Sequence, residues 1–159
     1  MVRFKNRWIL VELIPVTHGR AQLGKPTTGN QLDGKAVWSA LRQSVLTHFG
    51  DTGWGAVALS LTVKYYSPTT NICIIRVARD QHNIAWGAIT LLTAIEGVRY
   101  IPNVVQVSGT IKHAQLAAIA HNREVIARYR ALSKNPSAYE DSHAAYLEKS
   151  ELELQALQD

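Results

Sequence analysis

Runs of hydrophobic residues in the first half of the chain predict two β-strands. The run "RWILVELI" at 7–14 is rich in β-branched and aromatic residues, and we expect this strand to begin nearer Arg3 and to stop at Pro15. The run "AVALSLTVKYY" at 56–66 alternates in polarity, which is typical of a half-buried strand. One face of it is expected to carry Val57, Leu59, Leu61, Val63 and Tyr65.

Two further strands are predicted downstream. The turn residues "SPTTN" at 67–71 lead into "ICIIRVA" at 72–78, so the second and third strands are expected to form a hairpin. The third strand is apolar at almost every position, which indicates that both of its faces are covered. The segment "NVVQVSGT" at 103–110 predicts the last strand.

Apolar residues at helical spacing separate and follow the strands. They predict helices over about 34–49, 81–95 and 112–133. The first two helices are expected to begin at an acidic N-cap and to end at a glycine: Asp33 and Gly50, Asp80 and Gly97. The dipeptide "NP" at 135–136 predicts the start of a fourth, acidic helix or a frayed tail.

The predicted order is strand, helix, strand, strand, helix, strand, followed by helices. This is the split βαβ, ferredoxin-like pattern of an α+β sandwich, with an antiparallel sheet and helices on one face. The other face must meet solvent, the extra C-terminal helices or a partner. We divide the chain into one domain over 1–134, with a loop insertion at 15–32, and an acidic helix or tail over 135–159.

The chain has 159 residues and a net charge of +5, and this charge is unevenly distributed. Residues 1–134 contain 16 Lys and Arg against 6 acids, whereas residues 135–159 contain one Lys against 6 acids. A basic body favours a polyanion as its partner, with a plain solvated surface as the alternative. No apolar run approaches the roughly 18 residues of a membrane span, so no membrane partner is expected.

A search for catalytic and metal-binding patterns yields no candidate. The six His and the scattered acids show neither zinc-ligand spacing nor the gathered carboxylates of a two-metal nuclease. The segment "FGDTGWG" at 49–55 has no lysine and opens no helix, so we interpret it as a helix-to-strand turn rather than a phosphate loop. Cys73 is interpreted as a buried thiol rather than a nucleophile. Neither a catalytic residue nor a metal ligand is therefore expected.

Cations remain as the candidate functional residues. Arg3, Lys5 and Arg7 alternate along the first strand, which would project all three from one face. Four others lie near the ends of later strands, where they could form a rim that contacts RNA phosphates or could simply stay hydrated. These four are Lys64, Arg76, Arg79 and Lys112.

Three blocks of sequence resemble one protein family. They are "MVRFKNRWILVEL" at the start, "LTVKYYSPTTNICIIRVARD" at 61–80 and "VQVSGTIKHAQ" at 105–115. In this order, from Met1 to about Arg130, they resemble the small-subunit family of ribonuclease P and ribonuclease MRP named for "processing of precursors", number five. The presence of the insertion and of the acidic end resembles its eukaryotic branch rather than the shorter archaeal one, although neither segment matches a motif of the family.

The resemblance implies a ribonucleoprotein subunit rather than an enzyme. It implies that the RNA of the particle performs the hydrolysis with bound magnesium and removes the 5′ leader of precursor tRNA, or cuts precursor ribosomal RNA in the MRP particle. The protein is then expected to brace that RNA and to help position the precursor. The implied partners are the ribonuclease P or MRP RNA, precursor tRNA, a TIM-barrel-like protein subunit and other small subunits. No cofactor on the protein itself and a nuclear, nucleolar location are further expectations.

Positions within the three blocks supply the candidate RNA contacts. The seven cations named above are expected to meet phosphates. Hydroxyl or amide contacts are expected from a second set: Ser67, Thr69, Thr70, Ser108 and Thr110. A purely structural role is the alternative for the "SPTT" turn, and Gly109 is expected to allow close backbone approach.

The second helix is the candidate protein-binding surface. Trp86, Ile89 and Leu92 are proposed to contact a partner subunit, with packing in the core as the alternative. Two other functions compete with the subunit role: a ferredoxin-like regulatory domain that binds a ligand between paired domains, and a stand-alone metal-dependent ribonuclease. Salt-sensitive RNA binding without cleavage by the protein alone would favour the subunit.

Overall fold

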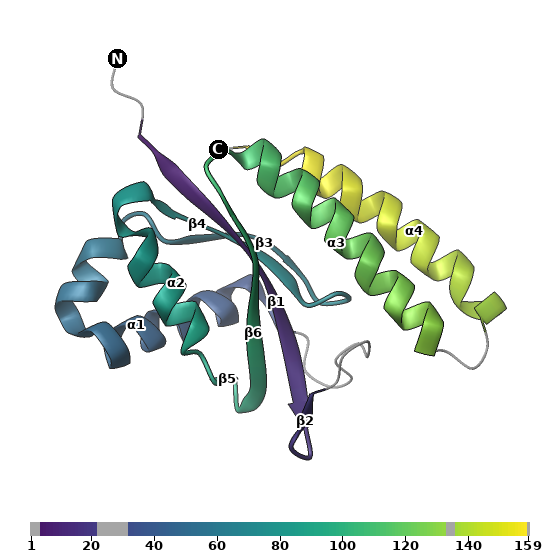
Figure 1. The fold of residues 1–159 in the computed structure, drawn as a ribbon, viewed down its shortest axis with the longest axis horizontal. Helices are drawn as coiled ribbons and strands as arrows, with labels where there is room; N and C mark the ends of the chain where they lie inside the picture. The colour runs from purple at the N-terminus through teal and green to yellow at the C-terminus, as the bar shows by residue number, and fades with distance from the viewer. Residues whose placement is uncertain (1–3, 22–31, 133–135, 159) are drawn as a thin grey trace.

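A computed structural model describes residues 4–21, 32–132 and 136–158. It shows three layers, with an antiparallel sheet between two layers of helices (Figure 1). One face of the sheet is covered by α1 (Gly34–Val57) and α2 (His82–Thr90), which share a hydrophobic core with it.

The C-terminal helices occupy the other face of the sheet. α3 (Ile111–Leu132) packs on the strands, and α4 (Pro136–Gln155) runs along the outer side of α3 (Figure 1). The sequence left open whether solvent, the C-terminal helices or a partner covers this second face of the sheet. The structure shows that the C-terminal helices cover it. None of the described helices combines the length and the hydrophobicity that crossing a membrane requires.

Four long strands form the sheet in the order β3-β4-β1-β6, and every neighbouring pair is antiparallel. They are β1 (Asn6–Thr17), β3 (Thr62–Ser67), β4 (Ile72–Ala78) and β6 (Val98–Ser108). Two short strands, β2 (Arg20–Ala21) and β5 (Ala94–Ile95), form hairpins with β1 and β6. The order of the long strands confirms the predicted ferredoxin-like fold.

β1 is buried on both faces, between β4 and β6. Ile9, Val11 and Leu13 belong to the core under α1 and α2, whereas Trp8 and Leu10 belong to the core under α3. Each of the five side chains is at most 2% exposed. Burying an apolar side chain of this size contributes about 1.5–3 kcal/mol. A single strand therefore ties the two cores together.

The predicted strand over 56–66 is wrong in its first half. α1 continues through a kink at Gly50, where φ is 67° and ψ is −168°, and ends at Val57. The segment "FGDTGWG" is thus helical after the kink, and the helix-to-strand turn expected there is also wrong. Leu59 was expected to share a face with buried residues, but it is fully exposed in the turn before β3.

A β-bulge then redistributes the side chains of β3. The register against β4 shifts between Val63 and Tyr65. Val63 consequently packs against the core under α1, whereas Tyr65 joins the core under α3. Strict alternation would have placed both residues on one face, and the bulge is the reason that this prediction is wrong.

β1 also passes through Pro15, where the sequence predicted its end. Pro15 lies opposite Tyr100 of β6, but the pairing of β1 with β4 has already ended at Glu12. At Pro15, no described strand pairs with the edge of β1 that faces β4 earlier in the strand. A residue that lacks an N–H therefore loses no ladder hydrogen bond there.

α2 is shorter than the sequence predicted. Asp80 lies in a 3₁₀ turn, η1 (Arg79–Gln81), and makes no side-chain cap for α2, which ends at Thr90. Glu96 and Gly97 both have positive φ, 49° and 80°, and form the two-residue turn between β5 and β6. Gly97 therefore turns a hairpin instead of ending a helix.

We predict that Gly50→Ala destabilises the protein by about 1–3 kcal/mol, because a Cβ is strained in this backbone region. Gly55→Ala is the matched control in the same helix, where an added Cβ meets nothing within 4 Å. This control should be neutral or stabilising by up to about 1 kcal/mol. Urea unfolding followed by circular dichroism measures both variants, and equal effects would contradict the kink.

Candidate nucleic-acid interface

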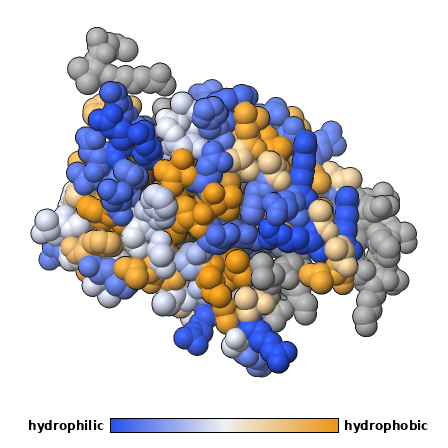
Figure 2. All heavy atoms as spheres, viewed as in Figure 1, coloured by the Kyte–Doolittle hydropathy of each residue, from blue (hydrophilic) through white to orange (hydrophobic). Residues whose placement is uncertain are grey.

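One end of the sheet gathers most of the predicted RNA contacts. β1 begins there, β4 and β6 end there, and α3 starts beside them (Figure 1). We call this end the basic rim and define it by its described cations: Lys5, Arg7, Arg76, Arg79 and Lys112. Figure 2 shows hydrophilic residues gathered around this end of the molecule.

Lys5 and Arg79 lie side by side on the rim. The backbone N–H of Arg79 donates to the carbonyl oxygen of Lys5 over 2.8 Å. Arg79 also forms an exposed ion pair with Asp80, Nε to Oδ1 3.2 Å, of a kind that contributes at most about 1 kcal/mol. Lys5 is exposed and forms no ion pair with a described residue. Both cations can therefore meet a phosphate without breaking a strong internal contact.

Arg7 is half-buried against the turn that leads into α3. Its Nη1 donates to the carbonyl oxygen of Asn6 over 3.3 Å. A Cβ added to Gly109 would lie 3.5 Å from the same nitrogen. Gly109 was expected to allow close backbone approach, and the side chain that a Cβ there would meet is that of Arg7. The guanidinium is thus held in place by its own chain.

The start of α3 lies next to these cations. The backbone N–H of His113 donates to Oγ1 of Thr110 over 3.4 Å, and Thr110 and Lys112 are both exposed. A helix start carries partial positive charge, which favours an anion beside Lys112. Ser108 differs, because it is buried and its Oγ accepts a hydrogen bond from Gln106 over 2.9 Å. The structure does not present its side chain to a partner.

Two predicted cations are not among the residues that define the rim. Arg3 falls outside the described residues. Lys64 lies at the bulge within β3, and it lines a shallow groove with Asp33 and Tyr66. The structure therefore brings together five of the seven cations, with Arg76 on β4 opposite Trp8 of β1.

The side chains of the "SPTT" turn are engaged within the protein. Ser67 and Thr70 are buried. The hydroxyl of Thr70 donates to Oδ1 of Asn122 over 2.8 Å, and the hydroxyls of Ser67 and Tyr146 are hydrogen-bonded to each other. The structural alternative is therefore correct for these two side chains, whose hydroxyls are not presented to a partner.

The same hydrogen bonds continue into α3 and α4. The amide of Asn122 donates to Oγ of Ser150 over 2.9 Å, and the hydroxyl of Tyr65 lies 2.7 Å from the same oxygen. The hydroxyl of Tyr129 donates to the carbonyl oxygen of Thr69 over 3.0 Å. Burial raises the pKa of Tyr65 to about 12, so its hydroxyl stays protonated near neutral pH. The turn, α3 and α4 are thus joined by buried polar contacts.

A buried carboxylate also fixes α3 to the sheet. Oε2 of Glu12 lies 3.0 Å from Nε2 of His121, and its Oε1 lies 3.6 Å from Arg128. Burial alone would raise the pKa of Glu12, but the hydrogen bond with His121, the charges of His121 and Arg128 and a hydrogen bond from Asn103 hold this pKa below 4.5. Sequence reasoning missed this cluster, and its one signal was an acid within an apolar strand.

We predict that this cluster makes folding stability sensitive to acid. The pKa of Glu12 is lower in the folded than in the unfolded chain, so its contribution is present above about pH 4.5 and is lost as the pH falls through the folded value. Glu12→Gln should cost about 1–3 kcal/mol at neutral pH and flatten the loss of stability below that pH. Urea midpoints measured from pH 7 to pH 3 check this, and parallel curves for both proteins would contradict it.

The three candidate partner contacts on α2 differ in exposure. Trp86 is 42% exposed, whereas Ile89 and Leu92 are 1% and 6% exposed and belong to the core. The core alternative is therefore correct for Ile89 and Leu92, which offer no surface to a partner. Trp86 stays a prediction.

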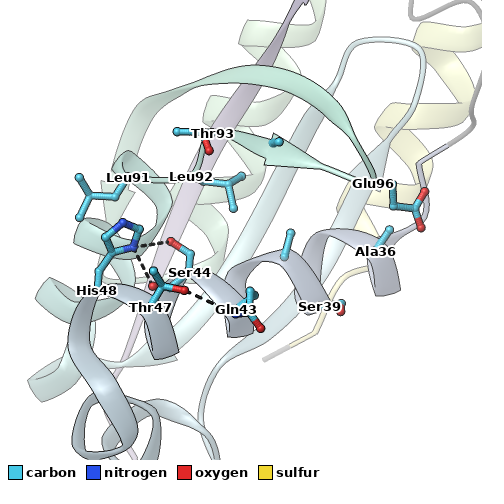
Figure 3. A pocket seen from close by; sticks show the side chains of 12 residues that line it. Ala36, Ser39, Gln43, Ser44, Thr47, His48, Leu91, Leu92, Thr93 and Glu96 are labelled. Atoms are coloured by element: carbon cyan, nitrogen blue, oxygen red, sulfur yellow. Dashed lines mark hydrogen bonds between the residues drawn. The ribbon is translucent and has the colours of Figure 1, made fainter.

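A groove of about 520 Å³ lies between α1 and the segment that joins α2 to β5 (Figure 3). His48 and Glu96 lie at opposite ends of it, and Nδ1 of His48 lies 2.8 Å from the carbonyl oxygen of Ser44. The rest of the lining is mostly small or uncharged. This groove holds no paired acid and base among the described residues.

Cys73 lies in the core under α1 and α2. Burial raises the pKa of its thiol to about 12, so little thiolate forms near neutral pH. This confirms the interpretation of Cys73 as a buried thiol. Within the described part of the chain, no three His, Cys, Asp or Glu side chains come together in a way that could hold a metal ion.

Comparison with known proteins identifies the family. The sequence model of the Rpp14/Pop5 family matches residues 7–119. Ribonuclease P/MRP protein subunit POP5 of Schizosaccharomyces pombe is 41% identical over 128 residues, which cover 79% of this chain and 91% of that protein. The human protein of the same name is 30% identical over 127 residues, which cover 77% of this chain and 73% of that protein.

A solved structure agrees with the fold. A chain in the cryo-EM structure of yeast ribonuclease MRP superposes with a TM-score of 0.54, covering 78% of this chain and 95% of that chain. Its sequence identity is 11%, so this likeness supports the fold alone. The family match spans most of the chain and includes the second and third of the three blocks and residues 7–13 of the first. This chain belongs to the Rpp14/Pop5 family.

Proposed function

We propose that this protein is a non-catalytic subunit of the ribonuclease P and ribonuclease MRP ribonucleoproteins. The names of its relatives, which are called ribonuclease P/MRP protein subunits, support this role. The observation that carries the proposal is the basic rim at one end of the sheet. Its five cations are Lys5, just before β1, and one residue each from β1, β4, η1 and α3. A folded RNA is the polyanion that such a rim fits best.

The rim is built to neutralise phosphates at fixed positions. Alternate residues of a strand lie about 6.6 Å apart, so Lys5 and Arg7 can meet different phosphates. β1 is buried on both faces beyond Arg7, so the backbone that carries these cations is fixed before binding. Binding therefore costs less conformational entropy. Contacts of this kind fix the orientation of a protein on RNA and carry no base sequence information.

In this proposal the protein braces the catalytic RNA and helps to position precursor tRNA, while magnesium ions held by the RNA drive removal of the 5′ leader. No cofactor resides on the protein. Trp86 is a candidate contact for a TIM-barrel-like subunit or another small protein of the particle, because it is the exposed member of the predicted set. The assembly would work in the nucleus and nucleolus.

We predict that RNA binding by the purified protein falls steeply with salt. Four phosphate contacts with single strands give a slope of log K against log salt near −2.8. Replacing Lys5, Arg79 and Lys112 by Ala removes up to three contacts and should bring the slope to about −0.7, while the thermal midpoint changes little because none of the three side chains is buried.

The control variant replaces three cations outside the rim, Lys35, Arg99 and Lys149, by Ala. Fluorescence anisotropy with the ribonuclease P RNA of the same organism measures both variants at several salt concentrations. The control should keep the wild-type slope. Equal losses in the two variants would show that total charge, rather than the rim, sets the affinity.

We predict that the purified chain does not cleave precursor tRNA in magnesium, whereas adding it to particles depleted of it restores removal of the 5′ leader. The triple rim variant should restore less activity than the wild-type protein at equal concentration. Gel analysis of end-labelled precursor reports both results. Cleavage by the chain alone, abolished by a point substitution in this chain, would support a stand-alone ribonuclease instead.

A further inference from the structure

A groove of about 490 Å³ lies between the start of α1 and β3, and we call it the β3 groove. Its lining includes Asp33, the N-cap of α1, together with Lys64 and Tyr66 of β3. Among the described strands, β3 pairs only with β4 and is the outermost strand of the sheet. The groove therefore opens at the edge of the sheet, where a ligand can enter from outside.

The bulge in β3 brings a cation and an aromatic ring to this groove. The register against β4 shifts between Val63 and Tyr65, so Lys64 is the extra residue of the bulge. As a result, Val63 and Tyr66 both pack against the core under α1, whereas Tyr65 joins the core under α3. Bulges commonly re-aim a side chain next to a functional site.

Tyr66 offers a fixed aromatic surface to the groove. Its side chain is half-buried against the core under α1, and its hydroxyl donates to Oδ1 of Asn71 over 3.4 Å. Burial raises the pKa of Tyr66, so the ring stays uncharged near neutral pH. A neutral aromatic ring of this kind is a surface on which a nucleic-acid base can stack.

The groove also carries two opposite charges. Lys64 forms no ion pair with a described residue, so its ammonium group is available for a phosphate. Asp33 is exposed, and its Oδ1 accepts one hydrogen bond, from the backbone N–H of Lys35 over 3.4 Å. A carboxylate has about four acceptor positions, so Asp33 can accept further N–H groups from a ligand.

The β3 groove lies close to the basic rim. Arg76, a rim residue on β4, is paired with Thr62 at the start of β3. Lys64 follows Thr62 by two residues, so its backbone lies within about 10 Å of that of Arg76 at the usual dimensions of a sheet. An RNA strand that contacts the rim could therefore extend into the groove.

A nucleotide fits these three groups better than an acidic peptide does. The phosphate, the flat face of the base and the N–H groups of the base correspond to Lys64, Tyr66 and Asp33. An acidic peptide would instead be repelled by the carboxylate of Asp33. Proteins recognise unpaired RNA bases by the same combination, with stacking on an aromatic ring and hydrogen bonds to the base edge.

We propose that the β3 groove binds one unpaired nucleotide of the particle's RNA, with its base on Tyr66, its phosphate on Lys64 and its N–H groups on Asp33. Guanine is the preferred base, because its N1–H and N2–H₂ groups are adjacent donors that match a carboxylate. The inference rests on the proposed function, since it assumes RNA at the rim. It adds recognition of a base to phosphate contacts that carry no sequence information.

The test uses the purified full-length chain and two labelled single-stranded RNAs, a uridine oligomer and the same oligomer with one central guanosine. Fluorescence anisotropy measures both affinities. The wild-type protein should bind the RNA with guanosine about fivefold or more tightly. Asp33→Asn should remove this preference and leave α1 intact, because Asn is an equally good N-cap. Asp51→Asn, at an exposed position of the same helix, is the matched control and should keep the preference.

Two further pairs of variants test the ring and the cation. Tyr66→Leu should weaken binding of both RNAs about fivefold or more, whereas Tyr66→Phe retains the stacking surface and should bind as the wild type does. Lys64→Ala should weaken both and reduce the slope of log K against log salt by about 0.7, whereas Lys149→Ala on α4 should change neither. Asp33→Asn and Tyr66→Phe keep the test decisive if Tyr66→Leu does not fold.

Three results would overturn the inference. The first is equal binding of the two RNAs by the wild-type protein, or a preference that survives in Asp33→Asn. The second is a loss of affinity in Tyr66→Phe as large as that in Tyr66→Leu. The third is binding of a glutamate peptide that depends on Lys64 while RNA binding does not, because the occupant would then be an acidic protein segment.

The proposed function fails separately. If an affinity-tagged wild-type chain recovers no ribonuclease P or MRP RNA from the organism's cells, the subunit role is wrong whatever the oligomers show. If the tagged chain recovers that RNA and the purified chain binds both oligomers equally, the subunit role stands and only the nucleotide site is wrong.

Discussion

The structure depends on the burial of one strand from both sides. β1 pairs with β4 and β6 through its backbone, and its side chains alternate between two separate cores. Trp8 is 1% exposed and Ile9 and Leu10 are fully buried, so the position of β1 is set within three residues of its start. Cations just before this point extend a fixed element, which is why a sheet can hold several positive charges at its edge. In the proposed function, the same rigidity lets them meet a folded RNA without first being ordered.

Buried polar contacts, in addition to the apolar cores, fix the C-terminal helices to the sheet. Glu12 joins β1 to His121 and Arg128 of α3, and buried hydroxyl and amide groups join the "SPTT" turn to both C-terminal helices. A buried polar group costs free energy unless it is paired. A shift of α3 would leave these groups unpaired, so the contacts favour one position of the helix. α4 then runs antiparallel to α3, and Gln115 near the start of α3 donates to the carbonyl oxygen of Leu157 over 2.9 Å. Most of the acidic end of the sequence thus forms a helix that packs on α3.

The sequence predicted the strand order, the hairpin, the third helix and the family, because each has a local signature in hydrophobic period or motif. It failed where the backbone departs from regular geometry. The kink at Gly50, the bulge at Lys64 and the passage of β1 through Pro15 each depend on neighbours far away in the chain. For the rim, charge and strand ends were enough to find Lys5, Arg7, Arg79 and Lys112. The inward direction of Ser67 and Thr70 could not be predicted, because their partners lie on α3 and α4.

The central claim is that the end of the sheet where β1 begins faces RNA in the assembled particle. Ultraviolet crosslinking of intact particles, followed by mass spectrometry of the peptides that carry nucleotides, tests it most directly. The account predicts nucleotide adducts on the peptides that contain Lys5 and Arg7, Arg79, and Thr110 to Lys112, with none on α4. Adducts confined to α4 or to the outer side of α1, with the rim peptides unmodified, would contradict it.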